Sequence, residues 1–288
     1  MKVTEKHGAH AKLPAALLSM LLILPILTGC GADATLPAEI SNGIAQSEGH
    51  CEQITAIINW QLDGNAAYRE QRDKFKESGD PRDEPQDTYD EVVVKYDELS
   101  AVMADLSVLK ARADTLPPGG NDAETAIIQA ARDYFAMLDA ACRDLDAVFT
   151  YYFAMRDAML PMRDFTAAEN TTGYNDYALF AGQLSQVISQ TQSKLESVSC
   201  PGYMSDSHSA FTARIDEFQS FCQDFSIAVQ LSDPLRIASC NYRMQRLGLM
   251  LDKCDDALTD DFALQFSRVA ERLNGTAAEL RGELLAYV

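Results

Sequence analysis

Apolar positions recur at helical spacing along most of the chain. Between residues 39 and 68, apolar side chains follow one another at three-, four- and seven-residue steps, which places them on one face of a helix. The pattern returns in segments 92–109, 127–152, 177–195 and 211–229. No stretch alternates with a period of two, as a half-buried strand does. We therefore predict an all-α fold.

Proline, glycine and capping residues separate these helical segments and set their expected ends. We expect Asn121 or Asp122 to cap the third helix and Ser232 or Asp233 to cap the sixth. Thr259, followed by two aspartates, predicts the start of a seventh. The predicted breaks are Ser78–Asp87, Leu116–Asp122, the end of helix three near Pro161, the joint Asp164–Asp176, Cys200–Gly202 and Ser232–Pro234.

About seven long helices joined by short turns predict an elongated antiparallel bundle. Shifting the chain by 84 residues places Pro117 on Pro201 and Asp122 on Asp206, a weak sign of duplication. The body is then two stacked helical modules, residues 38–163 and 164–288. The alternative is one continuous bundle.

The first thirty residues have a different character. Three lysines precede an almost wholly apolar run from Leu13 to Leu27, the layout of a secretory signal. The run is shorter than the roughly 20 residues of a membrane span. It ends in Leu27-Thr28-Gly29-Cys30, which resembles the lipobox of bacterial lipoprotein precursors.

That resemblance implies a processing pathway. The Cys30 thiol receives a diacylglyceryl group, and a peptidase cuts between Gly29 and Cys30. Residues 1–29 are then the signal peptide, and residues 30–37 form a lipid tether that holds the body on the cell membrane or outer membrane. The alternatives are an ordinary secretory signal with an incidental cysteine, or an uncleaved N-terminal anchor.

The net negative charge of the chain limits the classes of partner that we expect. The full chain has a formal net charge of −19, and loss of residues 1–29 would leave 21 basic and 42 acidic residues. Such a surface repels phosphate backbones. We therefore expect no nucleic acid partner. The membrane, reached through the N-terminal lipid, and an envelope protein are the expected partners.

Six cysteines follow Cys30, an even number that in an exported protein suggests disulfides. Antiparallel helices that meet at Ser232–Asp233 would bring Cys222 and Cys240 to about the same level, so we predict a bridge between them. The alternative is that the cysteines are buried thiols. No CxxC pair and no histidine at zinc-finger spacing occur, so we expect no metal and no cofactor.

The remaining residues with catalytic potential are sparse. His50 and His208 lie in polar surroundings, and we expect both to be solvated. Met155, Met159 and Met162 share a helix face and are expected to fill a core rather than bind Cu(I). The familiar motifs of helical enzymes, such as HExxH or paired ExxH, are absent from the sequence. We expect no catalytic residue.

Aromatic residues gather near the middle of the chain, at the end of helix three and the start of helix four. Across the joint they could line a groove for a peptide or an apolar ligand, although core packing is the simpler interpretation. The candidate groove residues are Tyr151, Tyr152, Tyr174, Tyr177 and Phe180.

Together these features predict a lipid-anchored cell-envelope lipoprotein with a non-catalytic binding or scaffolding role. One alternative is an envelope receptor for a solute, using the aromatic groove. Another is an envelope enzyme of unfamiliar type, for instance one that pairs His208 with buried carboxylates.

Overall fold

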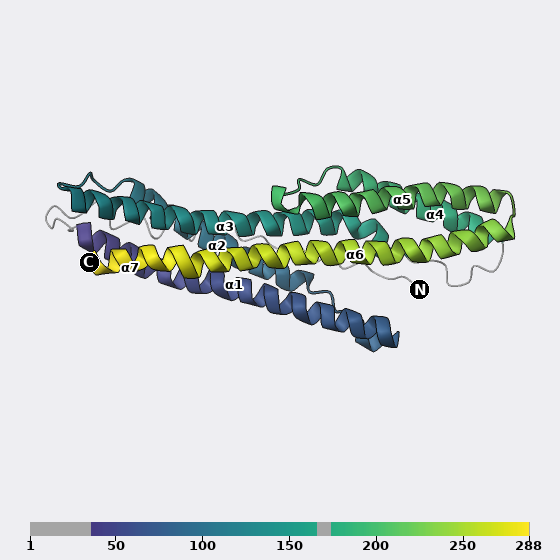
Figure 1. The fold of residues 1–288 in the computed structure, drawn as a ribbon, viewed down its shortest axis with the longest axis horizontal. Helices are drawn as coiled ribbons and strands as arrows, with labels where there is room; N and C mark the ends of the chain where they lie inside the picture. The colour runs from purple at the N-terminus through teal and green to yellow at the C-terminus, as the bar shows by residue number, and fades with distance from the viewer. Residues whose placement is uncertain (1–35, 166–173, 288) are drawn as a thin grey trace, which may run out of the picture.

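The computed structural model describes residues 36–165 and 174–287, and within them the chain is helical with no strand. The predicted signal peptide and most of the predicted tether lie outside the described residues. The elongated all-α architecture is confirmed (Figure 1). The elements are α1 (Leu36–Ser78), η2 (Pro81–Asp83), α2 (Tyr89–Asp114), α3 (Asp122–Arg163), α4 (Tyr174–Leu195), η3 (Gly202–Met204), α5 (Ser205–Gln230), α6 (Pro234–Arg272), η4 (Leu273–Ala277) and α7 (Ala278–Tyr287).

Two of the predicted caps hold helix starts in place. The Asn121 side chain accepts a hydrogen bond from the backbone N–H of Glu124 at 2.9 Å and opens α3. Asp233 accepts from the N–H groups of Leu235 and Arg236 and opens α6, with Pro234 in the first turn. Each cap satisfies donors that have no partner within the helix.

The predicted helix start at Thr259 is wrong, and the described residues form six long helices rather than seven. Thr259 lies inside α6, where its hydroxyl donates to the Asp255 carbonyl at 2.9 Å. The neighbouring Asp260 pairs with Arg69 of α1 instead of capping a helix. The helix then continues through the π-helical turn η4 into α7. From Pro234 to Tyr287 it is about 80 Å long at 1.5 Å per residue.

The end of the molecule where α1 begins and α7 ends is called proximal here (left in Figure 1). Its core is a four-helix bundle in which α1, α2, α3 and the α6–η4–α7 helix each run antiparallel to their neighbours. Apolar side chains from all four helices meet there and are almost completely buried, among them Ile44, Leu99, Leu138, Phe266 and Leu284.

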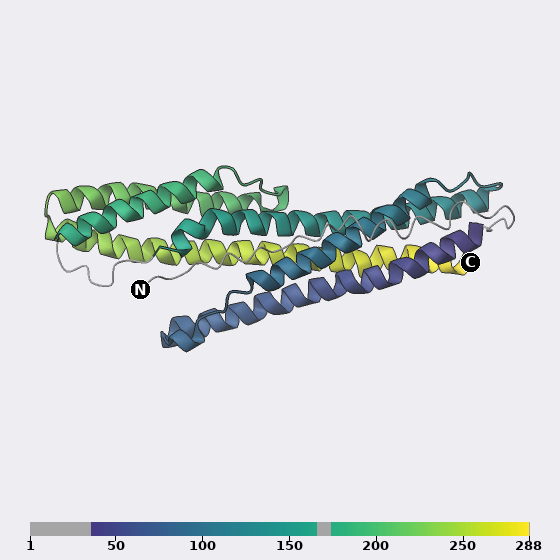
Figure 2. The same ribbon diagram turned by 180° about the vertical axis from the view of Figure 1, so that it is seen from behind.

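A second core fills the distal end, where the α5–α6 turn lies. It combines the last turns of α3 with α4, α5 and the first two-thirds of α6 (Figure 2). Fully buried members include Tyr151, Ile188, Ile215, Phe221 and Cys222.

The two cores do not follow the expected division between residues 163 and 164. Tyr151 and Met155 precede that boundary and belong to the distal core, whereas Phe266 and Leu284 follow it and belong to the proximal core. Both α3 and α6 pass through both cores. We call the region between the two cores the waist. It contains Phe262, which is partly buried and packs against both cores.

Ion pairs fasten the C-terminal part of α1 to the middle of α6. Arg69 pairs with Asp260, Arg72 with Asp256, and Lys76 with Asp252 at 3.0 Å. These pairs, like that between Glu48 and Arg281 nearer the proximal end, fix an antiparallel register along the two helices. In both views the C-terminal end of α1 angles away from the body, so long charged side chains span the widening gap.

Candidate functional site

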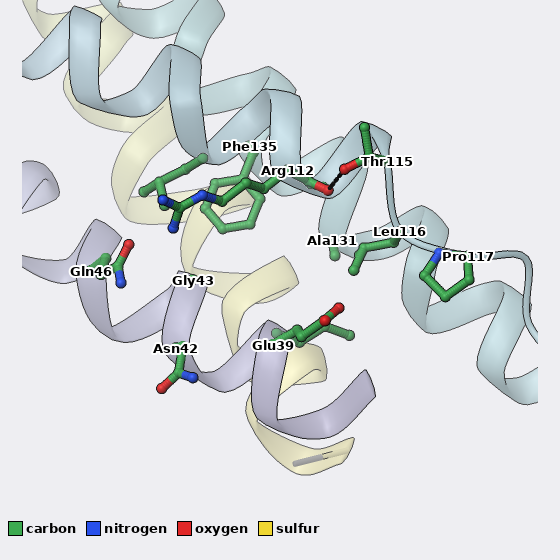
Figure 3. Close-up of a pocket in the computed structure, with 13 residues that line it drawn as sticks. Glu39, Asn42, Gly43, Gln46, Arg112, Thr115, Leu116, Pro117, Ala131 and Phe135 are labelled. Atoms are coloured by element: carbon green, nitrogen blue, oxygen red, sulfur yellow. Dashed lines mark hydrogen bonds between the residues drawn. The ribbon is translucent and has the colours of Figure 1, made fainter. Parts of the chain in front are cut away.

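The proximal end contains a cavity of about 400 Å³ where α1, α2 and the linker to α3 come together (Figure 3). Its floor is apolar and includes Ile40, Leu109 and Phe135. Its rim is polar. The full lining is Glu39, Ile40, Asn42, Gly43, Gln46, Leu109, Arg112, Ala113, Thr115, Leu116, Pro117, Ala131 and Phe135.

Gly43 brings α1 close to Phe135 at this cavity. A Cβ atom at position 43 would lie 3.0 Å from the Phe135 ring, closer than carbon atoms normally approach. Figure 3 shows the ring between α1 and α2, above Gly43. A larger residue at position 43 would push the ring into the cavity, so the glycine helps to keep the space open.

The chemistry of this lining suits binding. Glu39 and Arg112 supply one charge of each sign, and Asn42 and Gln46 supply amides. The Thr115 hydroxyl donates to the Arg112 carbonyl at 2.8 Å and is already engaged. An apolar floor with a few polar groups at its edge is typical of a small-ligand site.

Sequence reasoning missed this pocket, because it depends on how three separate segments pack. The available signals were a glycine within the apolar pattern of the first helix and the Pro-Pro-Gly-Gly turn that follows Leu116.

A shallower hollow lies beside the π-helical turn, between α3 and the end of α6. An ion pair between Arg272 and Asp144 crosses it. Gly275 lies in that turn, and π-helical turns often occur at functional sites. The remaining lining residues are Gln265, Arg268, Glu271 and Thr276.

The waist holds a polar cluster around His208. Its Nδ1 lies 2.9 Å from the Tyr151 hydroxyl, and the two rings meet edge to face. His208 is therefore half-buried and hydrogen-bonded, not solvated as expected. Its partner is a phenol rather than the carboxylate that the enzyme hypothesis invoked.

Burial keeps the groups of this cluster uncharged near neutral pH. It lowers the pKa of His208 and raises the pKa of the Tyr151 hydroxyl and of the Cys200 thiol. The pKa of Tyr203 rises to about 12 for the same reason. The neutral imidazole and the neutral phenol therefore form a polar contact between two uncharged groups.

The structure does not bring the candidate groove residues together. Tyr151 and Tyr152 both pack against Phe262 at the waist. Tyr177 and Phe180 both pack against Phe225 in the distal core.

The register of α3 and α4 explains this separation. Lys194, in the last turn of α4, bonds to Asp157 near the end of α3, so the first turns of α4 extend beyond α3. Tyr174 begins α4, and its side chain lies outside the described residues. Neither of the two hollows described above includes these aromatic residues.

The predicted disulfide partners occupy neighbouring helices. Cys222 on α5 and Cys240 on α6 are both buried in the distal core, and both are free thiols in the structure. Burial raises the pKa of Cys222 to about 11, which makes the thiol unreactive. The bridge therefore stays a prediction. The predicted lipidation and cleavage residues, Gly29 and Cys30, lie outside the described residues.

In residues 36–165 and 174–287, no group of three or more histidine, cysteine or acidic side chains is arranged to hold a metal ion. Over the same ranges, no helix combines the length and apolar character of a membrane span. Comparison of the chain with protein-family models, curated proteins and solved structures finds no match.

Proposed function

We propose that this protein is an exported, lipid-anchored lipoprotein of the bacterial cell envelope with a non-catalytic binding or scaffolding role. The observation that carries the proposal is Leu27-Thr28-Gly29-Cys30 at the end of a basic-then-apolar leader. Acyl chains on Cys30 hold the protein on the membrane because each buried methylene contributes about 0.8 kcal/mol.

The position of the first helix supports this proposal. Helix α1 begins at Leu36, six residues after Cys30. Six extended residues span at most about 20 Å. A lipidated Cys30 would therefore hold the proximal end of the bundle close to the membrane surface.

The chemistry of the described clusters favours binding over catalysis. The proximal cavity has one acid, one base and amides around an apolar floor, and the His208 cluster is held uncharged by burial. The cavity lining suits recognition, and the partner of the His208 imidazole among the described residues is a phenol rather than a carboxylate that would orient it as a base.

The test is to express the full chain in a bacterial host and measure its intact mass and membrane fractionation. Cys30→Ala is the test variant, and Cys254→Ala, which alters a cysteine within the body, is the matched control. We expect a mature chain that starts at Cys30 and carries acyl chains. The acyl mass should be lost in Cys30→Ala and kept in Cys254→Ala.

Two results would contradict the anchor. One is a wild-type chain without acyl mass in the soluble fraction. The other is a Cys30→Ala chain that is cut at the same bond and stays with the membrane, which would mean that something other than Cys30 lipidation holds it there.

The proximal cavity supports a second candidate function, a receptor for a small amphipathic ligand. Native mass spectrometry of protein isolated from its host should reveal a bound molecule. Asn42→Trp, which places a large side chain at the cavity rim, should abolish the adduct, whereas Glu52→Trp on an exposed position of the same helix should not. A wild-type protein free of any adduct, or an adduct unchanged in Asn42→Trp, would reject this candidate.

A further inference from the structure

The outer face of distal α6 exposes an apolar stripe. Leu235, Tyr242 and Leu249 follow one another at seven-residue intervals and are 83%, 72% and 64% exposed. Seven residues are close to two helical turns, so the three side chains lie along one side of the helix. That side faces away from the distal core, which α6 contacts through Ile237, Cys240 and Leu247.

Helix α1 covers the continuation of this same face. The next position in the series is Asp256, which pairs with Arg72 of α1, and Lys76 pairs with Asp252. Helix α1 then ends at Ser78, part of the way along α6 (Figure 1). Beyond that point, no described helix shields the three apolar side chains, as their exposure shows.

Charge changes sign along α6 where α1 ends. The part beneath α1 presents Asp252, Asp255, Asp256 and Asp260, which face basic residues of α1. The distal part, residues 234–251, contains three arginines and no acidic residue, in a chain with a net charge of −19. Arg236 pairs with Asp233 and Arg243 pairs with Asp224 of α5, whereas Arg246 forms no ion pair with the described residues. Arg246 lies one turn after Tyr242 and borders the stripe.

We propose that Leu235, Tyr242 and Leu249, with Arg246, form a docking surface for an acidic amphipathic helix of a partner protein. A helix fits because α1 already packs lengthwise along the next part of this face. Acidic flanks fit because Arg246, beside the stripe, is not neutralised by an ion pair with the described residues. The proposal rests on the binding role proposed above but not on the lipid anchor.

Charge also argues against a second copy of this chain as the occupant. Two α6 helices packed through this stripe would place the Arg246 side chains of both copies beside it, and segment 234–251 has no acidic residue to pair with them. An acidic partner removes that repulsion and gains attraction along the arginine side of the stripe.

The probe is a synthetic helical peptide of about three heptads, with leucine at the core positions and glutamate at the flanks. A second peptide carries lysine in place of each glutamate. Fluorescence anisotropy measures the binding of each peptide to the full chain in mild detergent. We expect the glutamate peptide to bind and the lysine peptide to bind at least about tenfold more weakly.

Variants of the stripe test the location of the site. Tyr242→Glu should weaken binding of the glutamate peptide by about tenfold or more, because it places a negative charge in the centre of the apolar surface. Val108→Glu is the matched control, since Val108 is 50% exposed on α2 in the proximal bundle. Circular dichroism establishes that both variants keep the wild-type helix content. Arg246→Glu should weaken the glutamate peptide and strengthen the lysine peptide.

Three results would overturn the proposal. The first is equal binding of the two peptides, and the second is equal loss of binding in Tyr242→Glu and Val108→Glu. The third is a dimer of the full chain in sedimentation that Tyr242→Glu dissolves, because the occupant would then be a second copy. A Cys30→Ala chain is measured in parallel, and its unchanged peptide binding separates this surface from any failure of the anchor.

Discussion

The hydrogen bond between Ser47 and Tyr134 provides a sharp test of the proximal core. Both residues are almost completely buried, and their hydroxyl oxygens lie 2.9 Å apart. Ser47 donates its single hydroxyl proton to the Ile44 carbonyl at 2.8 Å, so Tyr134 donates to Ser47. The Cys51 sulfur also lies 3.9 Å from the phenol oxygen and is a weak acceptor.

Ser47→Ala leaves the buried Tyr134 donor without its oxygen acceptor. An unsatisfied buried donor costs about 1–3 kcal/mol, and the better helix propensity of alanine returns about 0.5 kcal/mol. We expect a net loss of about 0.5–2.5 kcal/mol. Tyr134→Phe leaves Ser47 bonded to Ile44, so it should cost only about 0.5–1.5 kcal/mol.

The double variant decides whether this reasoning is right. Phenylalanine at position 134 removes the unpaired donor that Ser47→Ala creates, so the double variant should be at least as stable as Ser47→Ala alone. Urea unfolding followed by fluorescence measures the free energies. Trp60, the one tryptophan of the chain, packs against the proximal core and reports on it directly. If the losses in unfolding free energy of the two single variants simply add in the double variant, Ser47→Ala does not leave the Tyr134 hydroxyl unpaired, and the reasoning is refuted.

Three further predictions concern the proximal core, the waist and the thiols. Phe266→Ala removes a buried ring that packs edge to face on Phe149 and should cost about 3–5 kcal/mol in urea unfolding; a loss below about 1 kcal/mol would mean that the proximal core re-forms around the gap. Because burial lowers the pKa of His208 from its usual 6.5, the unfolded chain binds more protons once the pH falls below that value. The free energy of unfolding should therefore decrease as the pH falls below that value. His208→Gln should make the urea midpoint depend less on pH in this range. Under reducing conditions, alkylation of the native protein should label half-buried Cys254 before Cys142 and Cys222, whose pKa values rise to about 12 and about 11, and mass spectrometry measures this order. Without reductant, the loss of two hydrogen atoms from a peptide pair that contains Cys222 and Cys240 would establish the predicted bridge.

Local signals in the sequence predicted the helices well. Asn121 and Asp233 cap the helices that were expected to follow them, because a capping side chain acts on backbone groups two or three residues away. The prediction that a helix starts at Thr259 was wrong because it used the same kind of local signal. The Thr259 hydroxyl is satisfied within the helix by the Asp255 carbonyl, and the aspartates around it pair with a helix nearly 190 residues earlier in the chain.

The arrangement of the cores required information that no single segment carries. Leu284 packs with α1 residues such as Ile44 because α6 and α7 form one uninterrupted helix. One long-range signal was available. The basic series Arg69, Arg72 and Lys76 matches in spacing an acidic series on α6, and pairing the two sets the antiparallel register. The proximal cavity has a weaker signal in the sequence, since Gly43 and Phe135 meet only after three segments have packed.

The closure of the proximal core by α7 has a consequence for synthesis and export. Leu284 is fully buried in the proximal core, where α7 packs against α1 and α3, and Arg281 pairs with Glu48 across 233 positions of sequence. A ribosome must therefore complete almost the whole chain before this bundle can close. Contacts so distant in sequence slow folding, which leaves the growing chain open for longer. For the export proposed above, a chain that stays open until its last helix emerges would be well suited to threading through a secretion channel before it folds.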